Sequence, residues 1–168
     1  SADGQLTFAI VTHPAGNGFS DPVYVGAKVA ADLIGAKILL LGSESPTDDP
    51  ARAIEILNQL IQDPTIDGII LTTPQAGAYD DIVKTAEKNG IPVATTNSFD
   101  PGIYNRSGIS HTGQDASAAA IAGEALVKCL LDKGVEGGSI LLPSSTAMGN
   151  IVVNNRVTAA FNAIVKCL

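Results

Sequence analysis

Short apolar runs alternate with longer amphipathic stretches along the first hundred residues. The runs with the length of buried strands fall at residues 6–11, 37–41, 68–72 and 91–96. Stretches with helical spacing follow the first three runs, at residues 21–34, 50–62 and 78–89. Strands that alternate with helices in this way predict an α/β fold, a Rossmann-like parallel sheet flanked by helices. Ligands bind such sheets beyond the carboxyl ends of the strands.

Helix ends carry the residue types that favour them. Asp21 is expected to cap the first helix, and Asp48 or Asp49 the second, where Pro50 falls near the first helical position. Gly90 is expected to end the third helix. These positions fix the expected boundaries of the three βα units.

The alternation breaks after residue 97. Residues 98–112 are polar and rich in glycine and lack helical spacing, so we interpret them as a crossing between two lobes. The expected domains are an N-terminal Rossmann-like lobe, 1–110, and the incomplete start of a C-terminal lobe, 111–168.

The second lobe is expected to hold two helices, residues 116–133 and 151–168, and one strand, residues 139–142. One strand cannot make a sheet by itself. We therefore expect a shortened form, a split product or a chain that pairs with another copy, since exposed sheet edges favour self-association.

The composition narrows the class of protein. Hydrophobic residues make up 45% of the chain and aromatic residues only 4%, so the core is expected to be aliphatic, as parallel sheets require. The net charge of -7 argues against a nucleic-acid partner. No apolar run approaches the roughly 20 residues that span a bilayer. The first residues show no leader, so either the protein is cytosolic or a leader has been removed.

The two cysteines, Cys129 and Cys167, have a spacing that matches no metal or redox motif. Two interpretations stay open. Both are buried helical thiols, or they form a disulfide between two helix ends in an oxidising compartment. We predict no metal and no cofactor.

Polar side chains collect in the loops that follow the predicted strands. The candidates for ligand contact are Asn17, Phe19, Asp21, Thr73, Asn97, Asp115, Asn155 and Arg156. Amide, carboxylate and guanidinium groups supply the paired donors and acceptors that bind hydroxyl groups. An aromatic ring can cover the apolar face of a sugar. Asp21 and Asp115 are equally well explained as helix caps, and Arg156 as a surface residue of its helix.

Catalytic motifs are not evident in the same loops. The run Gly16-Asn17-Gly18-Phe19-Ser20-Asp21 lacks the third glycine of a dinucleotide fingerprint, and no P-loop occurs. Ser144 and Ser145 have no nucleophile-elbow setting. We therefore predict a protein that binds and does not catalyse, while an enzyme on the same scaffold is the remaining alternative.

The order of several short motifs is similar to that of a known family. They are Phe8-Ala9-Ile10-Val11-Thr12-His13 with Asn17-Gly18-Phe19, Asp67-Gly68-Ile69-Ile70-Leu71, Gly90-Ile91-Pro92-Val93 with Thr96-Asn97-Ser98, and Gly113-Gln114-Asp115. On these motifs the chain resembles the type I periplasmic sugar-binding proteins of the ribose/galactose-binding class. Those proteins share their fold with the effector domains of LacI-type repressors.

The resemblance implies two lobes that close on a sugar about a hinge. It places the ligand contacts at Asn17, Phe19, Asp21, Thr73, Asn97, Asp115 and Arg156. Two departures stand out. Ser20 follows Phe19 where many members carry a second aromatic residue. Ala159 stands where glycine is usual, so Asn155 competes with Arg156 for the contact.

The function that the resemblance implies is an extracytoplasmic receptor for a monosaccharide or a sugar-like polyol. Its expected partners are the sugar and the membrane subunits of an ABC importer, and its expected place is the periplasm after removal of a leader. The alternative is the effector-binding domain of a LacI-type transcriptional regulator.

Overall fold

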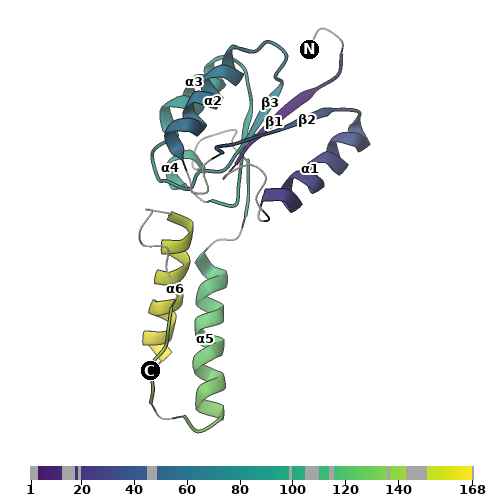
Figure 1. Cartoon of the computed structure of the whole chain (residues 1–168). Helices are drawn as coiled ribbons and strands as arrows, with labels where there is room; N and C mark the ends of the chain where they lie inside the picture. The colour runs from purple at the N-terminus through teal and green to yellow at the C-terminus, as the bar shows by residue number, and fades with distance from the viewer. Residues whose placement is uncertain are drawn as a thin grey trace. The chain divides into compact units, whose positions relative to one another are not determined.

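The structure, a computed structural model, describes residues 4–12, 18, 20–44, 49–98, 100–104, 110–113, 116–135, 137–142 and 151–167. The chain forms two compact units, Ser1–Thr112 and Gly113–Leu168. Figure 1 shows the first as a sheet flanked by helices and the second as helices. Among the described residues, no helix is both long enough and apolar enough to cross a membrane.

The first unit is built on one parallel sheet of five strands in the order β2-β1-β3-β4-β5. The strands are β1 (Thr7–Val11), β2 (Lys37–Leu41), β3 (Gly68–Leu71), β4 (Val93–Thr96) and β5 (Ser110–Thr112). The helices are α1 (Ser20–Ile34), α2 (Pro50–Gln62), α3 (Asp80–Lys88) and the short α4 (Pro101–Tyr104). This is the predicted α/β fold, and the carboxyl ends of all five strands share one edge.

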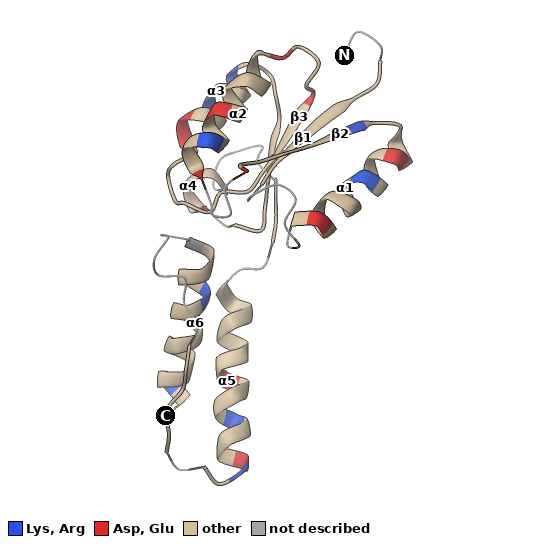
Figure 2. Ribbon diagram, in the orientation of Figure 1, with Lys and Arg blue, Asp and Glu red and all other residues tan. Residues whose placement is uncertain are grey.

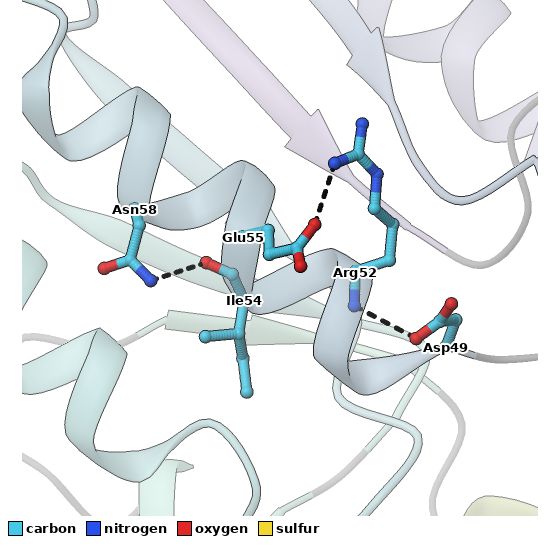
Figure 3. A network of polar contacts seen from close by, with 5 residues as sticks. All are labelled: Asp49, Arg52, Ile54, Glu55 and Asn58. Carbon is cyan, nitrogen blue, oxygen red and sulfur yellow. Dashed lines mark hydrogen bonds and ion pairs between the residues drawn. The ribbon is translucent and has the colours of Figure 1, made fainter.

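Helix α2 begins as the sequence predicts. Asp49 is its N-cap, with its side-chain oxygen accepting a hydrogen bond of 3.0 Å from the backbone N–H of Arg52 (Figure 3). On the outer surface, Arg52 pairs with Glu55 at 2.9 Å, and Asn58 donates to the carbonyl of Ile54 at 3.0 Å. The cap satisfies one of the amides that a helix start leaves open.

Helix α3 ends at Lys88, and Gly90 closes it from just beyond its C-cap, as predicted. Gly90 has a φ of 77°, which side-chain-bearing residues rarely adopt. Its N–H donates to Glu87 O at 2.9 Å, and the N–H of Ile91 donates to Ala86 O at 3.0 Å. This pair of bonds satisfies the last helical carbonyls and turns the chain into β4.

The two faces of the sheet are covered unequally. Helices α2 and α3 cover one face, and Ala9, Val11, Ile69 and Leu71, which point toward them, are at most 1% exposed. Figure 1 shows α1 beside the other face. There an apolar cavity of about 400 Å³ is lined by side chains of α1 and of alternate strand residues, among them Phe8, Ile38, Ile70 and Ala94. This face is only partly closed.

Part of the expected irregular crossing is regular. Asp100 is followed by the helical turn α4, and β5 pairs with β4 in register Ala94↔Ser110 to Thr96↔Thr112. A three-residue strand is too short to show a period in the sequence, and it forms because β4 offers a free edge. The first unit consequently runs to Thr112.

The second unit holds α5 (Ala116–Asp132) and α6 (Ile151–Cys167), which lie side by side (Figure 1). The expected strand at residues 139–142 is wrong, because those residues form no strand. A strand needs a neighbour to pair with, and the described part of this unit supplies helices only.

Cys129 and Cys167 lie on these two helices, and both are free and exposed. The interpretation of both as buried thiols is therefore wrong. Figure 2 shows that most of the length of α5 and α6 carries no charged residue. Because these two helices carry few charged residues, apolar side chains also occupy their exposed faces. The apolar character of a cysteine therefore does not indicate that it is buried in this unit.

Candidate functional site

Hydroxyl groups line the carboxyl edge of the sheet. Thr12 follows β1 and Thr72 follows β3, and the Thr72 hydroxyl donates to the Thr12 hydroxyl at 3.2 Å. The Thr72 N–H also donates to Val11 O at 2.9 Å, so the parallel pairing continues into these loops. The two hydroxyls are thus held side by side where a ligand of a parallel sheet is expected.

Thr73 and Asn97, two of the predicted contacts, follow the adjacent strands β3 and β4 at this same edge. The structure brings their loops together: Thr73 Oγ1 donates to the backbone carbonyl of Ser98 at 3.4 Å. The Thr73 side chain is fully buried, so its hydroxyl serves the contact between the loops. It reaches a ligand only if the loops move.

Asn97 has an unusual backbone for a residue with a side chain. Its φ is 63°, in the left-handed region that asparagine tolerates better than most residues. Its N–H donates to Thr112 O at 2.9 Å, which ties it to the end of β5. Asn97 is half-buried, so part of this residue is open to solvent at the carboxyl edge.

Asp21 lies in the first turn of α1 and is exposed. Because α1 begins at Ser20, Asp21 is the second helical residue, and the expectation that it caps the helix is wrong. A carboxylate in the first turn still interacts favourably with the helix dipole.

Asn155 and Arg156 belong to the second unit, in the second turn of α6. Asn155 is exposed and Arg156 is half-buried. Their contact with a ligand stays a prediction. Asn17, Phe19 and Asp115 lie outside the described residues, so their roles stay predictions.

Asp100, in the loop after β4, is not among the contacts predicted from the sequence. Its carboxylate is buried and accepts two backbone hydrogen bonds, from Gly77 N at 2.9 Å and from Gly102 N at 3.0 Å. The bond to Gly102 could have been suspected from the sequence, because an aspartate directly precedes Pro101, the first residue of α4. The bond to Gly77, 23 residues away, could not.

A histidine stands next to the edge. Thr95 Oγ1 and His111 Nδ1 share a hydrogen bond of 2.8 Å between β4 and β5. Burial lowers the pKa of the His111 imidazole below its usual value of 6.5. The imidazole is therefore mostly uncharged at neutral pH, and the edge near β5 gains no positive charge from it.

The chemistry of this edge is that of neutral polar recognition. Apart from the Asp100 carboxylate and the His111 imidazole, the described side chains considered at this edge carry hydroxyls and an amide, and the described residues contain no group of three or more His, Cys, Asp or Glu that could hold a metal ion. The apolar cavity of about 400 Å³ lies elsewhere, between α1 and the sheet, and has almost no polar lining. The edge, not the cavity, fits a hydroxylated ligand.

Comparison with known proteins identifies relatives of the chain. The ribose import binding protein RbsB of Haemophilus influenzae is 33% identical over 136 residues, which make up 79% of this chain and 43% of that protein. A periplasmic sugar binding protein of an ABC sugar transporter from Legionella pneumophila superposes with a TM-score of 0.75 at 17% identity, over 96% of this chain and 57% of its own.

A solute binding protein from Burkholderia graminis, solved in complex with D-arabinose, superposes with a TM-score of 0.76 at 24% identity, over 96% of this chain and 52% of its own. At these identities the solved structures establish the fold. The chain spans about half the length of these relatives.

A family model described as the periplasmic binding protein domain matches residues 8–166. Because this match covers nearly the whole chain, the chain belongs to the periplasmic binding protein domain family, a family of binding proteins.

Proposed function

We propose that the protein is a solute-binding receptor that delivers a monosaccharide or a sugar-like polyol to an ABC importer. The observation that carries this proposal is the hydroxyl- and amide-lined carboxyl edge in a chain of the periplasmic binding protein family. Neutral donors and acceptors match the hydroxyl groups of an uncharged sugar. The ribose-importing relative and the neighbour that holds D-arabinose support the same class of ligand.

The proposed ligand contacts remain those predicted from the sequence. They are Asn17, Phe19, Asp21, Thr73, Asn97, Asp115, Asn155 and Arg156. Of these, Asn97 has the strongest support, because it is a half-buried polar residue that follows β4 at the edge where ligands of parallel sheets bind. Thr73 acts within this proposal mainly through its contact with Ser98 O.

The rest of the proposal follows from the family. The receptor binds without catalysing a reaction and works outside the cytoplasm, in the periplasm, after its leader has been removed. It presents its sugar to the membrane subunits of the importer. We also propose that copies of the chain associate through the second unit, where Ile121 and Phe161 are more than half exposed.

Isothermal titration calorimetry against ribose, arabinose and a panel of other pentoses, hexoses and inositols tests the ligand class. We expect saturable heat with at least one of them. Asn97→Gly then removes the amide while leaving a residue that adopts a positive φ freely. Loss of one hydrogen bond, worth about 0.5–1.5 kcal/mol, weakens binding roughly 2- to 10-fold.

Asn58→Ala is the matched control, since Asn58 is an exposed asparagine on α2, away from the edge. It should leave the dissociation constant unchanged. A folded chain that gives no heat with any sugar or polyol would contradict the proposed ligand class.

A further inference from the structure

Two loops at the carboxyl edge carry the groups proposed to meet the ligand. The loop after β3 contains Thr73 and turns at Gly77, which has a φ of 73°. The loop after β4 contains Asn97, with a φ of 63°. Glycine adopts this left-handed backbone freely, whereas a residue with a side chain such as Asn97 keeps it only when its surroundings hold it.

Asp100 holds both loops at once. One carboxylate oxygen, Oδ2, accepts from the N–H of Gly77 in the first loop at 2.9 Å. The other, Oδ1, accepts from the N–H of Gly102 at the start of α4 at 3.0 Å. Asp100 itself is only 5% exposed, while the two glycines that donate to it lie at the surface. Hydrogen bonds to an ionised carboxylate are about twice as strong as neutral ones.

The surroundings leave the carboxylate little freedom. A Cβ built on Gly102 would stand 3.3 Å from Asp100 Oδ1 and 3.2 Å from Asp80 Oδ1, closer than most side-chain contacts. Asp80 is the first residue of α3. Asp100 is therefore packed between the starts of α3 and α4, and glycine at position 102 makes this approach feasible.

Thr73 adds a second tie between the same two loops, because its buried hydroxyl donates to Ser98 O at 3.4 Å. Ser98 follows Asn97 directly. The ties at Ser98 and Asp100 thus both lie within three residues after Asn97, and they join loops that lie more than twenty residues apart in sequence.

We propose that Asp100 is a positioning residue for ligand binding: its carboxylate locks the loop after β3 to the loop after β4 and so fixes the place of the Asn97 amide. The proposal rests on the proposed sugar-binding function. Asp100 does not itself meet the sugar. Replacing it by alanine removes the acceptor of the Gly77 and Gly102 amides, so the tie between the two loops and the tie to the start of α4 are both lost.

The test compares Asp100→Ala and Asp100→Asn with the unchanged chain in sugar titration. We expect Asp100→Ala to weaken binding at least 10-fold, and Asp100→Asn to weaken it less, because the amide keeps one accepting oxygen. Hydrogen exchange at Gly77 and Ser98 should quicken in Asp100→Ala, while exchange within β1 stays unchanged. If Asp100→Ala does not fold, Asp100→Asn carries the test.

Two controls separate positioning from stability. Asp63→Ala also removes an aspartate that caps a backbone amide, that of Thr65 at 2.8 Å, but far from the edge, and should bind normally. Val83→Ala empties a buried site in α3 and lowers the melting temperature. It too should keep the affinity of the unchanged chain at a temperature where both are folded.

The outcomes are distinct. Sugar binding by the unchanged chain together with equal affinity in Asp100→Ala overturns the positioning role. Unaltered exchange at Gly77 in that variant overturns it as well, whether or not a sugar is found. A chain that binds no sugar at all, but whose Gly77 exchange quickens in Asp100→Ala, overturns the proposed function and with it the link from Asp100 to a ligand.

Discussion

At the scale of single residues, the bond between Thr95 and His111 joins the last two strands and contains a titratable group. Because burial lowers the pKa of His111, the unfolded chain binds a proton more readily than the folded one between that lowered value and the usual 6.5. His111 therefore contributes stability that is fully present above pH 6.5 and is lost as the pH falls toward the lowered pKa.

Urea unfolding from pH 5 to pH 8 measures this contribution. The free energy of unfolding of the unchanged chain should rise with pH relative to that of His111→Gln, which keeps a hydrogen-bonding side chain but does not titrate. The difference between the two free energies of unfolding at each pH removes the contribution of His13, which both proteins contain. A difference that is flat across this range would contradict the role of His111.

The residue scale also shows what the sequence could predict of the site. Thr73 and Asn97 could be assigned to one edge, because the carboxyl ends of parallel strands always meet there. The buried state of Thr73 and the double role of Asp100 could not, because both depend on how the loops after β3 and β4 fold against each other. Such contacts between distant residues leave no periodic trace in the sequence.

At the scale of whole elements, two helical glycines differ in their surroundings: one is tightly packed and the other faces open space. Gly123 of α5 lies against α6, where an added Cβ would stand 2.7 Å from the backbone oxygen of Ala160. Gly26 of α1 has nothing within 4 Å of the same position. Glycine costs a helix about 0.5–1 kcal/mol relative to alanine, so only packing distinguishes the two sites.

Substitution by alanine should therefore act in opposite directions. Gly26→Ala raises the free energy of unfolding by about 0.5–1 kcal/mol through helix propensity alone. Gly123→Ala pushes α5 away from α6 and lowers the free energy of unfolding by about 1–3 kcal/mol, the range typical of overpacking. Chemical unfolding followed by circular dichroism compares them. Stabilisation by both substitutions would show that α5 and α6 do not pack this closely.

A helix or strand could be predicted where its local sequence favours it and the fold also supplies the neighbours that it needs. The cap at Asp49 and the stop at Gly90 act within a few residues, and both helix ends lie where the sequence predicts. The strand expected at residues 139–142 failed because an apolar run is necessary for a strand but does not supply its partner. The short β5 was missed for the opposite reason, since its partner β4 makes it a strand.

At the scale of the whole molecule, apolar surface is distributed unevenly. Parallel sheets are normally covered on both faces, yet the face beside α1 keeps an open apolar cavity. In the second unit, Ile121 of α5 and Phe161 of α6 are 65% and 53% exposed. Exposed apolar side chains of this kind are the basis of the proposed self-association.

The proposed self-association through the second unit can be distinguished from association through the first. In sedimentation velocity the chain should form larger species as its concentration rises, and the double substitution Ile121→Lys, Phe161→Lys should shift it toward the monomer. Lysine at these exposed positions adds charge that an apolar contact would have to desolvate. Val25→Lys on α1, where Val25 is 60% exposed, is the matched control. If Val25→Lys alone disperses the larger species, the contact is formed by the α1 side of the first unit, and the route through α5 and α6 is wrong.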